Sequence, residues 1–578
     1  MSKLNVDQKT IFDLLSDKKS DFLIPDYQRP YAWDEEQCQT LWDDIFTFSF
    51  PNNNYEEFDE SEEYFLGSIV TFQNDDGKLE VIDGQQRLTT LMLILRAFYD
   101  KFANMQDTNS RLTREKIEKC IWKTDTFGTA DKSTLKIDSE VATDNDKEEF
   151  LELLRTGIIP EKSRSQYVSN FKFFQTKIDE FLNTFPGFFA YLPARILGNC
   201  ILLPIEAESQ DTALRIFSTL NDRGLPLSDA DIFKAQFYKH YSEMGQKDWF
   251  IEEWRGLEDI TSKIFHPSTG APMDELFTRY MYYLRAKEGN KKTTTEALRK
   301  FFERDKYKYL KDESIVGDLK SLALFWENVA RQNKGVFSEI ILKKLFVLNY
   351  APNGMWQYIT SVYFLRNKDE NGILDNDKFS IFLNKITAFI FAYAITNPGV
   401  NALRTPVYAE MINIINGSNV NFTDFKFNKA QVKNYFENYK FTNLRPITRS
   451  LLTWYAYTFE NQELLVINET FELEHIFSKK RQEMEKGLTN AANLESLGNK
   501  ILLEESINIR AADYRFDDKK KIYSGETRRG KNADRSKIAE INEDIIKRDS
   551  FDENDIIERN ETILNKFYEL LEKENLIG

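Results

Sequence analysis

LGSIVTFQNDDGKLEVIDGQQRLTTLMLILRAFYDKF, residues 66–102, decides the fold of the N-terminal part of the chain. LGSIVTFQ (66–73) and KLEVID (78–83) are rich in β-branched and aromatic residues, and the Asn-Asp-Asp-Gly between them is a turn signal, so this stretch predicts a β-hairpin. LTTLMLILRAFYDKF (88–102) predicts a buried or amphipathic helix. Further along, ILLPIEA (201–207) predicts another strand. The N-terminal part therefore has the pattern of a mixed α/β domain.

The junction between the second strand and the helix has the features of an anion site. A strand ends at Asp83, Gly84 allows a sharp turn, and the helix begins near Gln85, so backbone N–H groups at the helix start are free to bind an anion. Arg87 lies in the first helical turn, where the helix dipole disfavours a cation. A bound phosphate would offset that cost.

Neighbouring side chains add to this prediction. Arg29, in the extended segment IPDYQRPYAW (24–33), is a candidate for a second phosphate contact, Asp83 for holding Mg²⁺, and Gln85 or Gln86 for orienting a water or a ribose. A structural alternative is equally compatible with the spacing: Arg87 would pair with Asp83 or Asp26. Asp-Gly-Gln-Gln-Arg alone is not a P-loop.

A second candidate site lies near the C-terminus. His475 follows Glu474 in FELEHIF (471–477), which predicts a strand end, and LGNKILL (497–503) predicts a second strand after a polar loop. Asn508 then opens a helical stretch. This strand, loop, strand, helix order matches the ββα-metal, or HNH, nuclease arrangement. Phosphodiester hydrolysis needs a base that activates water and a cation that stabilises developing charge. One histidine and one Mg²⁺ or Mn²⁺ with oxygen ligands would meet both needs.

The bulk composition sets limits. The chain has 578 residues, which predicts two to four domains. Its three cysteines form no Cys-x-x-Cys pair, so a zinc knuckle has no support. There is no signal peptide and no run of about 18 apolar residues, so we expect a cytoplasmic protein without a membrane span. The net charge of -16 argues against non-specific coating of nucleic acid but allows a local basic face.

Such a face is predicted between Lys519 and Lys537, where eight Lys or Arg stand against two acidic residues. Its place beside the nuclease motif favours DNA contact over a solvated helix face. The candidate DNA-binding residues are Lys519, Lys520, Lys521, Arg528 and Arg529.

Four motifs resemble the GmrSD-type family of type IV restriction enzymes and related SspE- and BrxU-like phage-defence proteins. They are IPDYQRPYAW (24–33), YFLGSIV (64–70), VIDGQQRLTTL (81–91) and FSTLNDRGLPLSDADIFKA (217–235), in the family's order. The resemblance implies a ParB/sulfiredoxin-like domain that binds and hydrolyses a nucleoside triphosphate, GTP or ATP. It implies nucleotide contacts at Arg29, Asp83, Gly84, Gln85, Gln86 and Arg87, and at Asn221, Arg223 and Gly224 of the family's Asn-x-x-Gly element.

The C-terminal motifs resemble the family's nuclease domain. By position, His475 is the general base, Asn499 holds the loop or the histidine orientation and is counted with Asn508 among the catalytic residues, and Glu474 and Asn508 are metal ligands. Lys519 fits the family's Phe-x-x-Lys element and would meet a phosphate. The sequence departs from the family in three places: Ser478 and Lys479 replace a proline, Lys500 replaces an apolar residue, and Asn508 replaces a final histidine.

We therefore predict an α+β multidomain protein, mainly helical. Its expected domains are a ParB-like nucleotide-binding domain with a helical extension (1–240), a helical linker or scaffold (241–460) and an HNH-type nuclease (461–578). The predicted function is a nucleoside-triphosphate-dependent endonuclease against modified or foreign phage DNA, with self-association left open. The alternatives are a nucleotide-controlled DNA-binding switch with an inactive nuclease, and a nuclease that acts on RNA.

Overall fold

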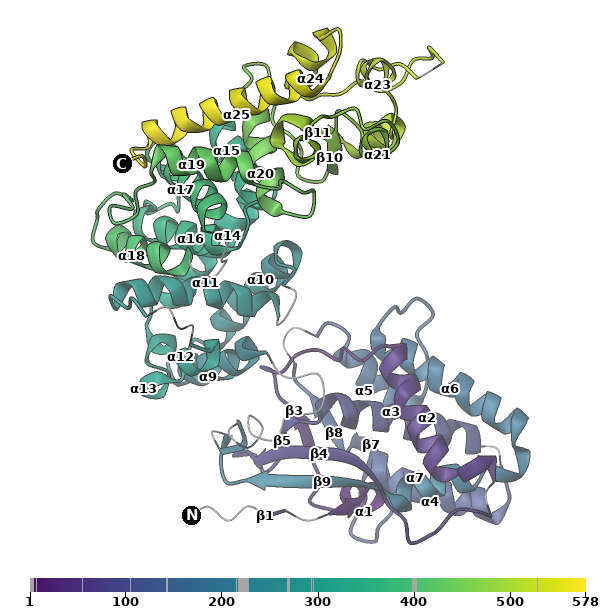
Figure 1. Cartoon of the computed structure of the whole chain (residues 1–578). Helices are drawn as coiled ribbons and strands as arrows, with labels where there is room; N and C mark the ends of the chain where they lie inside the picture. Colours follow the sequence, from purple (N-terminus) through teal and green to yellow (C-terminus); the bar gives the residue numbers. More distant parts are fainter. Residues whose placement is uncertain are drawn as a thin grey trace. The chain divides into compact units, whose positions relative to one another are not determined.

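The computed structural model describes residues 5–6, 8–54, 56–103, 105–141, 144–210, 212–214, 216, 228–267, 271–292, 294, 296–397, 403–527 and 529–578. It is a mixed α+β structure and mainly helical, with 58% helix, as the sequence predicts. Contacts divide it into two compact units, Met1–Arg255 and Gly256–Gly578. Both are shown in Figure 1.

The first unit is organised around a mixed seven-stranded sheet in the order β1-β9-β4-β5-β3-β8, with β2 also paired to β9. β4 runs parallel to β9 and antiparallel to β5, and β3 runs parallel to both β5 and β8. The long strands β4 and β9 lie side by side in Figure 1. The strands are β1 (Asn5–Val6), β2 (Lys9–Thr10), β3 (Phe22–Ile24), β4 (Tyr64–Gln73), β5 (Leu79–Asp83), β8 (Ile137–Ser139) and β9 (Cys200–Ala207).

The predicted hairpin is confirmed. β4 and β5 pair antiparallel with Val70 opposite Asp83 and Gln73 opposite Leu79. The turn closes through the Gly77 N–H, which donates to the Asn74 carbonyl at 3.0 Å. Gly77 has a φ of +79°, a conformation that residues with a side chain rarely adopt. The predicted strand 201–207 is likewise confirmed as β9.

The helix predicted after the hairpin is α3 (Gln85–Phe102), and it is buried over most of its length. Its apolar residues surround the helix rather than forming one stripe, which is the pattern of a helix enclosed by a core. It packs against α4 and α6. The other elements of this unit are α1 (Ile11–Ser16), α2 (Glu35–Ser49), α4 (Thr108–Ile121), β6 (Trp122–Thr124), β7 (Ala130–Leu135), α5 (Lys147–Thr156), α6 (Gln166–Thr184) and α7 (Tyr191–Asn199).

A smaller cluster that includes Tyr27, Ile82 and Ile205 holds α9 (Asp229–Glu243) through Ala235. Ser228 caps this helix, because its hydroxyl accepts from the Asp231 N–H. Residues 217–227, with the family's Asn-x-x-Gly element, lie outside the described residues.

The described residues of the second unit up to residue 460 are helical, as predicted. Helix α17 (Asn376–Thr396) is long and apolar enough, by length and composition alone, to cross a membrane, although polar residues interrupt its apolar sequence. Its apolar window is 67% buried inside the unit, as in the core helix of a soluble protein. The helices are α10 (Lys247–Ile264), which begins in the first unit, α11 (Pro272–Lys287), α12 (Leu298–Phe302), α13 (Arg304–Tyr307), α14 (Ile315–Ala330), α15 (Glu339–Asn349), α16 (Met355–Asn367), α17 (Asn376–Thr396), α18 (Arg404–Ile415), α19 (Lys429–Asn438) and α20 (Pro446–Ala456).

The C-terminal part contains the predicted strand, loop, strand, helix order. β10 (Phe471–His475) pairs antiparallel with β11 (Lys500–Glu504). Helix α20 packs against β11, so this hairpin and the helices before it belong to one compact unit. The remaining helices are α21 (Lys479–Glu485), α22 (Glu505–Ala511), α23 (Phe516–Tyr523), α24 (Ala539–Glu543) and α25 (Glu553–Lys573).

Candidate functional sites

The strand–helix junction has the predicted geometry. β5 ends at Asp83, Gly84 follows in the left-handed region at φ +87°, and α3 begins at Gln85. A Cβ at Gly84 would lie 2.9 Å from the Ser68 carbonyl oxygen, so only glycine fits between β4 and the helix start. The first turn of α3 therefore follows directly after the end of β5, where the free backbone N–H groups of a helix start can bind an anion.

The two glutamines after this glycine hold the segment 29–33 against the helix. The Gln86 Oε1 accepts from the Ala32 N–H at 2.7 Å and the Trp33 N–H at 3.3 Å, and its Nε2 donates to the Pro30 carbonyl at 3.1 Å. These contacts engage both ends of the amide. Gln85 donates its Nε2 to the Arg29 carbonyl, and its buried Oε1 has no partner among the described residues.

Arg87 lies directly against the backbone of β4. It donates Nη1 to the Ser68 carbonyl at 2.8 Å, and a Cβ at Gly67 would lie 2.7 Å from the guanidinium carbon. Burial raises the pKa of Asp83, against the Gly84 N–H and the charges of Arg87 and Arg29. Burial lowers the pKa of Arg87, against the charge of Asp83. Two guanidinium groups and one carboxylate thus share a partly buried region at the helix start.

The structural alternative for Arg87 is not realised as a direct ion pair. Arg87 has no carboxylate within 4.0 Å in the described part of the chain, and the carboxylate of Asp26 is engaged by Lys247 at 2.7 Å and by the Tyr238 hydroxyl at 2.5 Å. The nucleotide contacts predicted at Asn221, Arg223 and Gly224 lie outside the described residues.

The C-terminal hairpin separates its two adjacent candidate residues. In the β10–β11 register His475 stands opposite Lys500 and Glu474 opposite Ile501. Successive side chains of a strand point to opposite faces. Glu474 and His475 accordingly contact different partners, and each face is described in turn.

His475 lies in a polar cluster with Lys500, Glu495 and Asn443. The Lys500 ammonium is fully buried and reaches His475 Nε2 at 3.0 Å, Glu495 Oε2 at 2.7 Å and Asn443 Oδ1 at 2.5 Å. An ammonium has donors only, so His475 Nε2 is the acceptor and the neutral ring carries its proton on Nδ1. The accepting nitrogen of the predicted base is therefore engaged by Lys500 in this arrangement.

The charges of the cluster keep His475 neutral. Burial, together with the nearby Lys500 charge, lowers the pKa of His475 to about 3. Partial burial would raise the pKa of Glu495, but hydrogen bonds from Lys500 and Lys479 outweigh it and lower that pKa. Burial lowers the pKa of Lys500, against the opposing effect of Glu495. A neutral imidazole is the form that accepts a proton.

Glu474 is buried on the other side of the strand with Lys519 and Tyr523. Its Oε1 lies 2.6 Å from Lys519 Nζ and accepts from the Tyr523 hydroxyl at 3.1 Å, while the same ammonium donates to the His475 carbonyl at 2.6 Å. Burial raises the pKa of Glu474, with Lys519 and Tyr523 opposing it. Lys519 has 0% exposed surface, so the prediction that it meets a DNA phosphate is wrong for this structure.

The divalent-metal site predicted at Glu474 and Asn508 stays a prediction. The described residues contain no group of three or more His, Cys, Asp or Glu arranged to bind a metal ion. Glu474 is already neutralised by Lys519. Asn508, on α22, has a buried side-chain oxygen without a partner among the described residues, which would suit a ligand oxygen. Mg²⁺ in proteins commonly takes one or two protein oxygens and completes its shell with water and substrate phosphates, and of the two predicted ligands only Asn508 offers an uncommitted oxygen in this arrangement.

Asn499 holds the loop that follows the histidine. Its Oδ1 accepts from the Phe477 N–H at 2.8 Å, and its Nδ2 donates to the carbonyls of Phe477 and Leu494, each at 3.1 Å. A Cβ at Gly498 would lie 2.0 Å from the Ile556 carbonyl oxygen of α25, which explains the glycine before it. Asn499 is fully buried, so it acts by positioning this loop rather than by touching a substrate.

The other residues of the predicted basic run differ in their exposure. Lys520 is half-buried and donates to the Arg548 carbonyl, whereas Lys521 and Arg529 are exposed. Arg528 lies outside the described residues. Sequence reasoning noted Lys500 as a departure from the family, but it missed Glu495, Asn443 and Tyr523 as partners of the motif. Only the strand register brings these residues together.

Two family models match the chain, one in each compact unit. Residues 11–238 match the model of the GmrSD restriction endonuclease, N-terminal domain, and residues 423–566 match that of the GmrSD restriction endonucleases, C-terminal domain. The matches together cover more than half of the chain, and the chain belongs to the GmrSD type IV restriction endonuclease family. No curated protein matches it. The resemblance drawn from the sequence is thereby confirmed, and DNA is the partner that this family implies.

Proposed function

We propose that this protein is a nucleoside-triphosphate-dependent endonuclease that cuts modified or foreign phage DNA in the cytoplasm. The C-terminal hairpin supplies the cleavage chemistry and the first unit, with a ParB/sulfiredoxin-like fold, supplies nucleotide control. The observation that carries the proposal is the match of residues 423–566 to the family's C-terminal domain, with His475 at the end of β10 in an HNH-like order beside Lys500 and Glu495. Burial and the Lys500 charge lower the pKa of His475 in this arrangement, and release of the Lys500 contact would raise it toward the range that a general base for water needs.

The nucleotide would bind at the start of α3. Its phosphates would meet the backbone N–H groups of the first helical turn and the guanidinium groups of Arg87 and Arg29, and the unpartnered Gln85 Oε1 would accept from a hydroxyl of the ribose. Asp83, beside both arginines, is the candidate for a metal ion carried by the nucleotide. Either GTP or ATP satisfies this chemistry.

Cleavage is proposed to depend on Mg²⁺ or Mn²⁺, as the family resemblance implies. Because Glu474 is paired with Lys519 in this arrangement, the proposal gives the metal no step. The contribution of this chain's own residues is the base: His475 accepts a proton from water once Nε2 is released by Lys500. Asn499 positions the loop through which His475 is presented.

A regulatory switch with an idle nuclease is the competing function, and one observation favours it. Lys500 engages the accepting nitrogen of His475, and Lys519 engages Glu474, so neither functional group is free in this arrangement. A protein that bound DNA under nucleotide control without cutting it would retain these contacts throughout its cycle.

A cleavage assay separates the two. Unmodified, glucosylated and phosphorothioated plasmids are incubated with Mg²⁺ or Mn²⁺, with and without GTP or ATP. Wild type should nick or cut at least one substrate, and His475→Ala should lower the rate by about 10²–10⁴-fold. His266→Ala, at an exposed histidine of the second unit, is the matched control and should cleave normally. Cleavage by His475→Ala within a few-fold of wild type would remove this base from the mechanism.

A further inference from the structure

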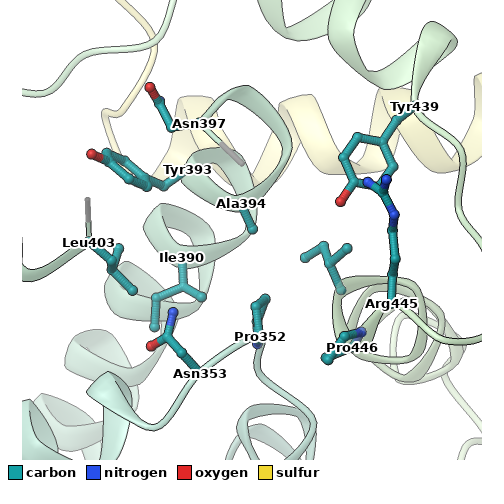
Figure 2. Close-up of a pocket in the computed structure, with 11 residues that line it drawn as sticks. Pro352, Asn353, Ile390, Tyr393, Ala394, Asn397, Leu403, Tyr439, Arg445 and Pro446 are labelled. Atoms are coloured by element: carbon teal, nitrogen blue, oxygen red, sulfur yellow. The ribbon is translucent and has the colours of Figure 1, made fainter. Parts of the chain in front are cut away.

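A cavity of about 280 Å³ lies in the second unit between the end of α17 and the start of α20 (Figure 2). Its volume is close to the lower end of small-ligand pockets, about 300 Å³. No carboxylate lines it, so its chemistry does not favour a cation. The lining residues are Pro352, Asn353, Ile390, Tyr393, Ala394, Asn397, Leu403, Tyr439, Arg445, Pro446 and Ile447.

The lining suits a planar ring that carries an anionic group. Tyr439 and Arg445 lie together on one side, with the guanidinium 4.6 Å from the ring centroid, and Tyr393 lies on the other side in Figure 2. Aromatic rings and an arginine plane are the surfaces on which nucleobases stack. Arg445 forms no ion pair with any described residue, so no carboxylate in the described part of the chain neutralises its charge. The amides of Asn353 and Asn397 add donors and acceptors.

The residue before the lining residue Arg445 carries an exposed apolar side chain. Leu444 precedes Arg445 and is 93% exposed, the highest value for any leucine among the exposed large hydrophobic residues that the structure describes. Exposure of a large apolar side chain to water is unfavourable, so Leu444 would be stabilised by an apolar partner. Its neighbour Arg445 lines a cavity that can hold a base. Apolar wedges of this kind enter the stack of a DNA duplex and occupy the space between base pairs.

We propose that the cavity receives a nucleotide turned out of a DNA duplex, with Leu444 filling the vacated place in the stack and Arg445 contacting the phosphate. This inference rests on the proposed function, because it names the part of the DNA substrate that the protein binds and recognises. A cavity lined by amides and tyrosines also has the hydrogen-bonding groups to distinguish a base with a hydroxylated substituent from an unmodified base.

The same segment connects the cavity to the nuclease cluster. Asn443, next to Leu444, accepts from Lys500 at 2.5 Å and donates to the Leu473 carbonyl of β10 at 2.7 Å. Lys500 in turn contacts His475. A shift of residues 443–445 on base insertion would therefore act on the contact that engages the predicted base. Recognition in the cavity would in this way favour cleavage.

The test uses the full-length protein without metal, so that DNA is bound but not cut. Duplexes of unmodified and modified DNA carry the fluorescent base 2-aminopurine at successive positions, and its emission rises when it leaves the stack. Wild type should raise the emission several-fold at one position. Leu444→Ala should remove most of the rise, and Ala394→Leu, which fills the cavity, should abolish it. Ile381→Ala, an exposed residue of α17, and Lys440→Ala, an exposed residue outside the lining, should retain it.

The outcomes distinguish this inference from the proposed function. Wild type that cleaves DNA without an emission rise at any position overturns the inference alone, as do Leu444→Ala and Ala394→Leu variants that keep the full rise. Wild type that neither binds nor cuts DNA overturns both. Free 2-aminopurine nucleotide is titrated in a separate arm. Free-nucleotide binding that Ala394→Leu abolishes, together with no emission rise at any position of the duplexes, would identify the cavity as a site for a free nucleotide and overturn the DNA source.

Discussion

Replacing Lys519 by methionine should destabilise the fold rather than weaken DNA binding at the surface. Lys519 is fully buried, its ammonium lies 2.6 Å from Glu474 Oε1, and it also donates to the His475 carbonyl. Methionine fills a similar volume but leaves the Glu474 carboxylate buried without its counter-charge. The Tyr523 hydroxyl, at 3.1 Å, still donates to the carboxylate but carries no charge.

Removing one partner of a buried ion pair costs about 3–5 kcal/mol, because the remaining charge is uncompensated. The double variant Glu474→Gln/Lys519→Met removes that charge and should recover much of the loss. Lys521→Met, on the same helix but exposed, is the matched control and should change stability by under about 0.5 kcal/mol.

Urea denaturation, followed by circular dichroism, measures these differences. Because the chain has two compact units, the transition of the second unit is the relevant one. A loss of under about 1 kcal/mol in Lys519→Met, the value typical of exposed pairs, would refute the argument. So would a double variant that is no more stable than Lys519→Met, because the stranded Glu474 charge would then not be the cause.

Four further predictions follow from the same contacts. Gln86→Leu strands the Ala32 N–H and should lower stability by about 2–3 kcal/mol, whereas Gln86→Glu keeps the Oε1 acceptor and should lose less in the same denaturation assay. Gly84→Ala should destabilise by about 1–2 kcal/mol from its positive φ alone, and an unchanged melting temperature would contradict this. Asn499→Ala should abolish plasmid cleavage while nucleotide hydrolysis by the first unit persists, a result that a general unfolding would not give. The pKa of His475 is about 3 in the folded state against 6.5 for the free side chain, so the unfolded chain binds more protons between these pH values. The free energy of unfolding should therefore fall as pH drops from 6.5 toward 3. His475→Gln should reduce this dependence on pH.

The local elements of the first unit were predictable, but the sheet was not. The turn at Asn74–Gly77, the helix from Gln85 and the cap at Ser228 follow from short-range patterns that a sequence displays directly. β3, by contrast, pairs in parallel with β8 more than a hundred residues away, with Phe22 opposite Ile137. Each strand has only three residues, and nothing in so short a run encodes its partner.

The sequence identified the residues of the candidate sites more accurately than it identified their contacts. Glu474 and His475 are adjacent in sequence, and a motif suggests that they act together, but a strand directs them to opposite faces. Lys519 belongs to a basic run, and its burial follows from the side of α23 that faces the hairpin. A count of charges does not contain that information, because a helix places neighbouring residues on different sides.

The contacts of the β10–β11 hairpin also show that residues before position 461 belong to the nuclease part of the chain. The Lys500 ammonium has three donors, and one of its acceptors, Asn443, comes from the helical region before residue 461. That region further contributes the Phe441 N–H, which donates to the Glu495 carbonyl at 2.9 Å, and Arg449, which pairs with Glu472 of β10 at 3.3 Å. A chain that began at residue 461 would leave a buried lysine with one acceptor fewer and expose the face of β11 that α20 covers. The family match starts at residue 423, in agreement with this packing. The helical region therefore completes the polar cluster that holds His475, and the nuclease part of the chain begins before residue 461.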